Sequence, residues 1–350
     1  MGQLKSSSFR PAWWLPGAHA QTLWPSLFRR RQTLRLGRTR VELADGDFID
    51  LATTSASGPR VLVIHGLEGD LRSHYAAATV AALTAAGFRP VFMHLRGCSG
   101  EPNRLARSYH SGATEDLVAV LDHLARTPEG PAAAAVGFSL GGNLLLKHLG
   151  ESDRSRLQAA VAVSVPFVLR DAMLRLGVGA SRLYQRYLLG RLKSSYRAKF
   201  ARLPSPLTID LEEIGDFFDY DDRVTAPLNG FAGADEYYGR CSCRPLLHHI
   251  RVNTLILHAA DDPFMFRHTV PGAAELGPGV ILELAEHGGH VGFVSGLRPW
   301  RPRYWLDDRI LEFLRDAIGS PAPAPRPDAV QVGRETVHQH LDGHHDQQHP

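Results

Sequence analysis

Short apolar runs alternate with helical segments along most of this chain, and this alternation restricts the fold more than any other feature. Runs of mostly apolar residues lie at 61–64, 90–93, 132–136, 159–165, 254–258 and 280–284. Apolar residues recur at helical spacing in 74–86, 113–126, 141–149 and a closing segment at 303–318. Each run has the length of a buried strand. Because strands that alternate with helices form parallel sheets, the pattern predicts an α/β fold with a mostly parallel, doubly wound sheet.

One hairpin precedes the alternation and one long segment interrupts it. Apolar residues flank the turn dipeptide Asp45-Gly46 within 33–54, which is typical of a β-hairpin. Residues 167–250 show helical and irregular patterns without a strong strand. We therefore expect a core built from 33–166 and 251–319, with 167–250 inserted as a helical cap.

The two ends of the sequence differ from the core in composition. Residues 1–32 are expected to form an N-terminal arm, and residues 1–40 hold eight basic residues, no acidic residue and three tryptophans. We expect this arm either to pack its tryptophans on the core or to touch an anionic membrane surface. Residues 320–350 are rich in Pro, Ala, Gln and His, a composition that predicts a disordered tail.

The overall composition is that of a globular protein, with 44% hydrophobic and 21% charged residues. No segment has the roughly 18 to 20 apolar residues that a bilayer span needs, and the N-terminus lacks the apolar stretch of a secretory signal. We expect a cytoplasmic protein, with peripheral contact to the inner face of the membrane left open. The basic arm has no nucleic-acid recognition module beside it, so no nucleic-acid partner is expected.

A nucleophile motif lies between one of the predicted strands and the next helix. Gly137-Phe138-Ser139-Leu140-Gly141 is a G-x-S-x-G string that follows the apolar run 132–136. In this context the serine lies on a sharp strand-to-helix turn at the carboxyl edge of the sheet. The motif predicts Ser139 as a catalytic nucleophile. Cys98 is the alternative nucleophile, and we expect it to be the weaker candidate because it lacks such a motif.

A serine hydroxyl needs a base, and the base needs a carboxylate to orient it. His287-Gly288-Gly289-His290 follows the last predicted strand, and we expect His290 as the base with His287 as its competitor. Asp261-Asp262-Pro263 follows the preceding strand, and its register favours Asp262 over Asp261. The chain order Ser, Asp, His is that of α/β-hydrolases.

The oxyanion of a tetrahedral intermediate needs two backbone N–H donors. One is expected from Leu140, directly after the nucleophile, and the other from Leu67 in the loop His65-Gly66-Leu67-Glu68-Gly69. His65 precedes the glycine of this loop, and we expect it to brace the loop.

Two further strings carry a family resemblance. Arg96 to Asn103 reads RGCSGEPN and is followed by SYHSG at 108–112, while 16–22 reads PGAHAQT. These strings resemble the YheT-like hydrolases, bacterial relatives of the animal ABHD lipases and of the yeast medium-chain acyl ester enzymes. The resemblance covers about residues 9–318 and implies esterase or lipase activity on acyl esters, with the triad on Ser139, Asp262 and His290.

The leading hypothesis is a serine hydrolase that cleaves carboxylic esters with apolar acyl chains, a carboxylesterase or monoacylglycerol-lipase-like enzyme, through an acyl-enzyme and without a metal or organic cofactor. Two alternatives stay open, namely acyl transfer to an alcohol acceptor and a non-catalytic binding protein on the same fold. Residues 170–202 hold nine basic residues and one acidic residue, and 210–222 hold seven acidic residues. Such a cap either admits an acyl chain beside an anionic interface or pairs its two charged segments with each other.

Overall fold

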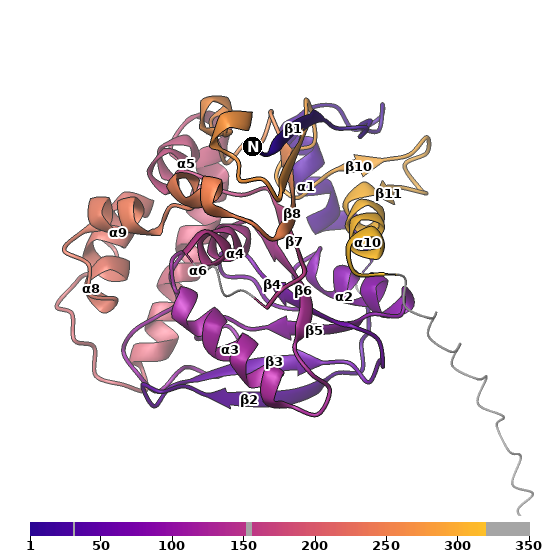
Figure 1. Cartoon of the computed structure of the whole chain (residues 1–350). Helices are drawn as coiled ribbons and strands as arrows, with labels where there is room; N and C mark the ends of the chain where they lie inside the picture. Colours follow the sequence, from indigo (N-terminus) through magenta and orange to yellow (C-terminus); the bar gives the residue numbers. More distant parts are fainter. Residues whose placement is uncertain (31, 152–155, 320–350) are drawn as a thin grey trace, which may run out of the picture.

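The structure is a computed structural model that describes residues 1–30, 32–151 and 156–319. Figure 1 shows a central sheet with helices on both faces and a helical layer beside it. The sheet has nine strands in the order β1-β9-β8-β7-β6-β4-β5-β3-β2. The predicted α/β fold class is confirmed by this topology. The predicted tail at 320–350 lies outside the described residues.

The six predicted apolar runs all form strands of the parallel part of the sheet. They are β4 (Arg60–Ile64), β5 (Arg89–Met93), β6 (Ala132–Phe138), β7 (Ala159–Val163), β8 (Asn253–Ala259) and β9 (Val280–Ala285). The predicted hairpin is β2 (Gly37–Glu42) paired antiparallel with β3 (Phe48–Thr53), and β3 pairs antiparallel with β5. Parallel strands end at the same edge, so the loops after β4, β6, β8 and β9 meet there.

Four helices cover the two faces of the sheet. On one face α3 (Thr114–Arg126) and α4 (Leu140–Glu151) bury leucines such as Leu117 and Leu144. On the other face α2 (Ala76–Ala85) and α10 (Trp305–Ile318) bury residues such as Val80 and Phe313. The two apolar clusters meet the sheet from opposite sides, which accounts for strands that are apolar throughout.

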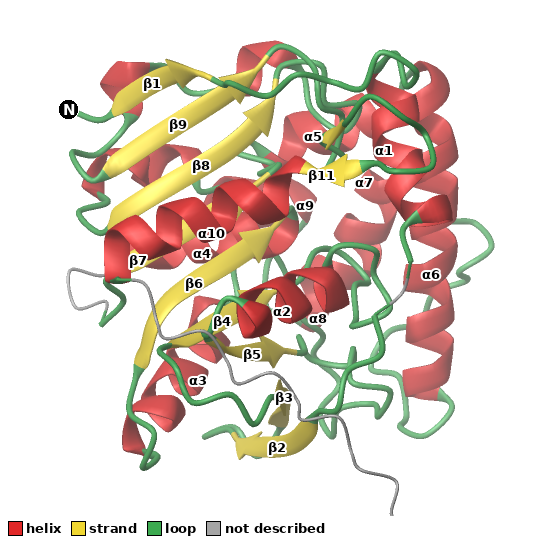
Figure 2. Cartoon of the chain, turned by 90° about the vertical axis from the view of Figure 1, so that its right-hand side faces the viewer, coloured by secondary structure: helices red, strands yellow, loops and turns green. Residues whose placement is uncertain are grey.

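The chain between β7 and β8 contains helices and no strand. Its elements are α5 (Leu169–Leu176), η1 (Gly179–Ser181), α6 (Arg182–Phe200), α7 (Phe217–Tyr220), the π-helical turn η2 (Asp221–Thr225), α8 (Ala226–Leu228), α9 (Ala234–Cys241) and η3 (Arg244–His249). They enclose an apolar cluster of their own around Leu189, Leu192 and Phe217. Figure 2 shows the long helix α6 standing beside the sheet at the edge where the parallel strands end.

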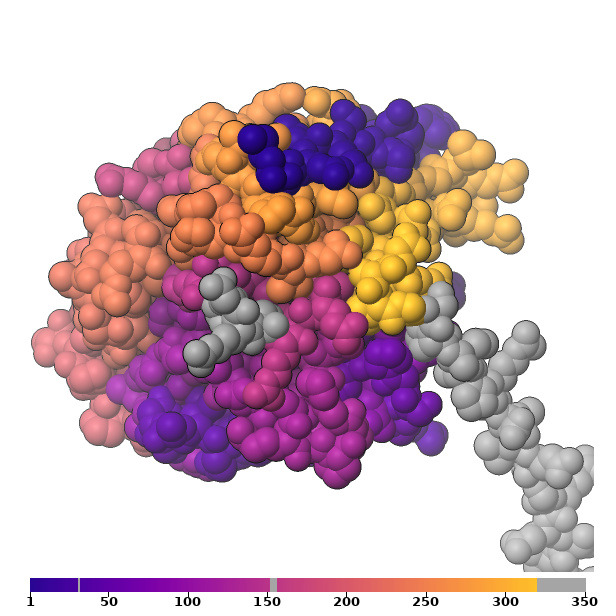
Figure 3. All heavy atoms as spheres, in the orientation of Figure 1, coloured from indigo at the N-terminus to yellow at the C-terminus, as the bar shows by residue number. Residues whose placement is uncertain are grey.

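The N-terminal residues join the sheet, which the sequence analysis did not predict. Strand β1 (Gln3–Ser6) pairs parallel with β9, and α1 (Ala18–Phe28) follows it. Beside α1 lies a small hairpin of β10 (Val294–Ser295) and β11 (Arg303–Tyr304). Figure 3 shows the N-terminal segment lying against the chain from the C-terminal third. Two short 3-10 turns, η4 (Arg267–Thr269) and η5 (Ala273–Glu275), lie between β8 and β9.

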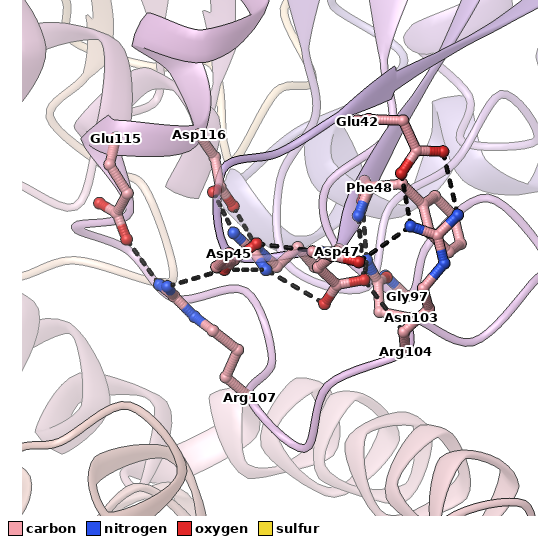
Figure 4. A network of polar contacts seen from close by, with 12 residues as sticks. Glu42, Asp45, Asp47, Phe48, Gly97, Asn103, Arg104, Arg107, Glu115 and Asp116 are labelled. Atoms are coloured by element: carbon pink, nitrogen blue, oxygen red, sulfur yellow. Dashed lines mark hydrogen bonds and ion pairs between the residues drawn. The ribbon is translucent and has the colours of Figure 1, made fainter.

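The string at 96–103 folds around a buried ion-pair network, drawn in Figure 4. The Arg96 guanidinium, only 4% exposed, pairs with Asp116 at 2.6 Å and Asp47 at 3.1 Å. Asn103 donates to Asp47 at 2.8 Å and accepts from the amide of Gly97. The network fixes the loop between β5 and α3 against the β2–β3 turn, and this loop lines the cavity described below.

Candidate active site

Ser139 lies in the turn between β6 and α4, and the turn is strained. Its φ is +52°, a left-handed conformation that costs a non-glycine residue energy. A Cβ atom on Gly137 would lie 2.4 Å from the carbonyl oxygen of Gly141, and one on Gly141 would lie 2.4 Å from that of His65. The glycines of the motif are therefore required by close backbone packing. The turn is held by the Ser139 amide, which donates to Val163 at 2.8 Å.

His290 lies between the serine and a carboxylate. Its Nε2 is 3.1 Å from Ser139 Oγ, and its Nδ1 is 2.9 Å from Asp262 Oδ2. Asp262 is 3% exposed and His290 8%. With Nδ1 donating to the carboxylate, Nε2 is left to accept from the serine hydroxyl. The structure thus brings together the three residues predicted from the sequence.

His287 and Asp261, the alternatives to His290 and Asp262, are arranged differently. His287 is exposed, and its Nδ1 lies 3.2 Å from Asp261. Asp261 accepts from the amides of Gly288 at 2.9 Å and Gly289 at 3.0 Å. Asp261 therefore holds the backbone of the histidine loop, whereas Asp262 contacts the imidazole itself.

Three further residues fix the histidine loop, and the sequence analysis missed them. Thr22 of α1 accepts from the amide of His290 at 2.9 Å. The ring of Phe264 stacks on the imidazole with 3.9 Å between centroids. Ser164, after β7, accepts from the amide of Val291 at 3.0 Å. Thr22 belongs to the string PGAHAQT at 16–22, but no local signal marks any of the three as a support of the histidine loop, because each meets the loop from a distant part of the chain.

Leu67 and Leu140 are the residues whose backbone amides are predicted to form an oxyanion hole. Leu140 begins α4, and the first amides of a helix have no acceptor within the helix. Leu67, Leu140 and Ser139 line the same cavity. A Cβ atom on Gly66 would lie 3.1 Å from the Cβ of Ser139, so the glycine lets the loop approach the nucleophile.

Two buried tyrosines hold this loop in place. Tyr75 accepts from the amide of Gly66 at 2.9 Å. Tyr109 accepts from the amide of Glu68 at 2.8 Å and donates to its carboxylate at 2.9 Å. Ser195 of α6 donates to the same carboxylate at 2.5 Å, which ties the loop to the cap. Glu68 has φ +51°, so these contacts hold a second strained residue.

The other two candidates near the site, His65 and Cys98, are disfavoured as reacting groups. His65 is fully buried, its Nδ1 lies 2.7 Å from the oxygen of Gly66 and its Nε2 accepts from Leu95 at 3.0 Å. Burial lowers the pKa of His65 to about 4, which keeps the imidazole neutral. Burial raises the pKa of the Cys98 thiol well above its usual range, so the thiolate that nucleophilic attack needs is disfavoured.

A cavity of about 300 Å³ opens beside Ser139 beneath the cap. Its lining from the cap is mostly apolar and includes Leu169, Met173, Leu176, Leu188, Leu192 and Phe217. The basic segment 170–202 and the acidic segment 210–222 of the cap pair with each other to a small extent. Both segments are fully described, and one ion pair, Arg197–Glu212, joins them.

The buried acid Asp221 lines the same cavity, and its position leads us to expect that the stability of the protein depends on pH. Burial raises the pKa of Asp221 to about 6, and its carboxylate accepts from Tyr238 at 2.8 Å. A raised folded-state pKa stabilises the protein below pH 3.8, and the stabilisation is lost as the pH rises through about 6. We expect Asp221→Asn, whose amide oxygen still accepts from Tyr238, to raise the free energy of unfolding by roughly 2 to 3 kcal/mol at pH 8.

Thermal and urea unfolding at pH 4 and pH 8 will measure this effect. The gain in the free energy of unfolding from Asp221→Asn is expected at pH 8 and is expected to be absent at pH 4. Asp235→Asn changes an exposed acid of the same cap and is expected to leave the free energy of unfolding unchanged at both pH values. A gain of equal size at both pH values would contradict the assignment.

The geometry and the comparisons with known proteins define the class of this protein. Residues 59–297 match the model of the α/β hydrolase fold family, and the chain belongs to that family. Within it the chain belongs to the YheT-like and ABHD-type group. It is 44% identical over 318 residues to "Putative esterase YheT" of Escherichia coli (strain K12), covering 88% of this chain and 93% of that protein.

A more distant relative agrees with this assignment, and a solved structure has the same fold. The chain is 28% identical to "Phospholipase ABHD3" of Mus musculus, covering 89% of this chain and 79% of that protein. Esterase Pf2001 of Pyrococcus furiosus has the same fold, with a TM-score of 0.55 at 16% identity over 82% of this chain and 92% of that structure.

Proposed function

We propose that this protein is a serine hydrolase that cleaves carboxylic esters with apolar acyl chains through an acyl-enzyme. The observation that carries the proposal is the hydrogen-bonded series Ser139–His290–Asp262 at the wall of a largely apolar cavity. The names of the esterase and phospholipase relatives support the ester as the bond that is cleaved.

The proposed reaction has two halves. Ser139 Oγ attacks the ester carbonyl carbon while His290 Nε2 takes the hydroxyl proton, and Asp262 stabilises the resulting imidazolium. The negative charge on the carbonyl oxygen is stabilised by the amides of Leu67 and Leu140. His290 then gives its proton to the leaving alkoxide. Water, deprotonated by His290, attacks the acyl-serine, and collapse of the second intermediate releases the carboxylic acid and restores Ser139.

Labelling with a fluorophosphonate tests the nucleophile directly. We expect one covalent adduct per chain, found by mass spectrometry on the peptide that contains Ser139, with loss of esterase activity in proportion to labelling. Cys98→Ser serves as the control and is expected to carry the adduct on Ser139 like the parent protein. An adduct on another residue, with activity lost in step, would show that Ser139 is not the nucleophile.

A series of esters with acyl chains of increasing length tests the substrate class. Each methylene that enters the cavity contributes roughly 0.8 kcal/mol, so kcat/KM is expected to rise about threefold to fourfold per carbon while the chain remains in contact with the cap. The rise is expected to end where the cavity ends. Met173→Trp, which adds volume to the lining, is expected to move the optimum to shorter chains. A steady fall from acetyl onwards would contradict an acyl-binding cavity and leave the serine chemistry untouched.

A further inference from the structure

Three segments outside the catalytic residues expose large apolar side chains. They are 9–30, which contains α1, 182–193, which is the first part of α6, and 291–304, which contains the β10–β11 hairpin. Together we call them the docking face. Their large apolar side chains that are more than 60% exposed are Trp13, Leu27, Phe28, Leu183, Tyr187, Leu297 and Trp300. Isolated exposed apolar residues are normal, but a cluster of this kind marks an interaction surface.

The three segments are neighbours, with α1 in the middle. On one side of α1, the guanidinium of Arg29 lies 4.1 Å above the ring of Tyr304 in the hairpin. On the other side, His19 of α1 lies 3.0 Å from the hydroxyl of Tyr184 in α6. Figure 2 shows α1, β11 and α6 on one side of the molecule.

The docking face is strongly basic. Its three segments hold ten arginines and lysines and no aspartate or glutamate. Among the described residues, two of these cations form an ion pair, Arg29 with Asp307 and Arg303 with Asp308 of α10. The remaining cations are interleaved with the exposed apolar residues, as in Leu297-Arg298-Pro299-Trp300-Arg301 and in Arg182-Leu183, Arg186-Tyr187.

Two tryptophans of the N-terminal segment are held in fixed orientations by hydrogen bonds to the hairpin. Trp13 donates its indole N–H to the oxygen of Leu297 at 3.1 Å, and Trp14 donates to Gly296 at 3.0 Å. Trp13 nevertheless leaves 75% of its surface exposed. An indole whose polar atom is bound while its ring faces solvent suits the boundary between lipid headgroups and acyl chains.

We propose that the docking face binds the surface of a bilayer that contains anionic lipids. Exposed aromatic and aliphatic side chains enter the headgroup and acyl boundary, while the arginines contact lipid phosphates. A second copy of this chain fits less well, because two such faces, each with ten cations and no acidic residue, would repel each other. Among the described residues no helix is long and apolar enough to cross a membrane, so the proposed contact is with the surface.

Helix α1 connects the docking face to the candidate active site. On its inner side, Gln21 of α1 donates to the oxygen of Val294 at 3.1 Å and accepts from its amide at 2.7 Å. Thr22 holds the amide of His290. The exposed residues of the docking face touch none of the reacting groups, so membrane binding and ester hydrolysis can be measured separately.

Vesicle sedimentation with the full-length Ser139→Ala protein tests the proposal without turnover of the lipid. We expect binding to vesicles of phosphatidylcholine mixed with phosphatidylglycerol, weak binding to phosphatidylcholine alone, and loss of binding at high salt. Leu27→Ser/Trp300→Ser and Arg298→Gln/Arg301→Gln are each expected to weaken binding by at least about tenfold. The matched controls on α3, Val118→Ser and Arg126→Gln, are expected to bind like the parent protein.

A second measurement separates docking from damage to the fold or site. When the same substitutions are made in the protein that keeps Ser139, all four variants are expected to retain the kcat/KM of the wild type on a short soluble ester. Equal vesicle binding by all variants, or no binding by the parent protein at low salt, would overturn the proposal. Concentration-dependent self-association that Leu27→Ser/Trp300→Ser abolishes, without vesicle binding, would overturn it in favour of an interface between copies of this chain.

Discussion

The Ser139→Ala protein is expected to fold normally and to lose ester turnover by on the order of 10⁶-fold in kcat. The substitution removes Oγ, which lies 3.1 Å from His290 Nε2 and is the atom proposed to form the acyl-enzyme. Alanine keeps the Cβ atom at φ +52°, so the strain of the turn is unchanged and stability should differ little.

Ser139→Gly is the informative companion variant. Glycine adopts a left-handed backbone without strain, so this variant is expected to be equally inactive but more stable by about 1 kcal/mol. Burst and steady-state hydrolysis of a p-nitrophenyl ester, together with urea unfolding, will compare the three proteins. Undiminished turnover by folded, pure Ser139→Ala protein would eliminate the proposed mechanism.

Asp262→Asn is expected to lower kcat by about 10⁴-fold, whereas Asp261→Asn should cost only a few-fold. An amide at position 262 presents an N–H to His290 Nδ1, which favours the tautomer that carries its proton on Nε2. That nitrogen can then no longer accept the proton of Ser139. Asp261 accepts two backbone amides of the histidine loop, and an asparagine oxygen can still accept them.

The ratio between the two variants is the measurement that matters, since both remove one negative charge from the same loop. Fluorophosphonate labelling rates should follow the same order as kcat, because labelling also needs the activated serine. A larger loss for Asp261→Asn would mean that the imidazole is oriented by the other acid.

Much of the fold could be predicted because the buried strands are apolar along their whole length. The runs that became β4 to β9 stand out from their surroundings, and their order gives the loops that meet at one edge. Strand β1 could not be found in this way, because all four of its side chains are exposed and its only strand feature is backbone pairing with β9. The sequence likewise gave no indication that α1 packs under the histidine loop.

The residues of the candidate site can likewise be separated into those that could be predicted from the sequence and those that could not. Ser139, His290 and Asp262 could be proposed from the strands that they follow, since register limits each choice to one or two residues. Tyr75, Tyr109 and Phe264 could not be proposed, because their contacts with the site join parts of the chain that are far apart in sequence. Glu68 was visible only as a loop residue, and its links to both the core and the cap depend on the tertiary structure.

The pairing of β1 with β9 has a consequence for synthesis of the protein. Gln3 lies opposite Ile281, so β1 leaves the ribosome long before the strand with which it pairs. At about 5 to 20 residues per second, β1 waits roughly 14 to 55 seconds for its partner. Thr22 waits similarly for His290, and a nascent chain therefore carries Ser139 for much of its synthesis without its proposed base. Ester cleavage is expected only from chains that have been translated beyond His290.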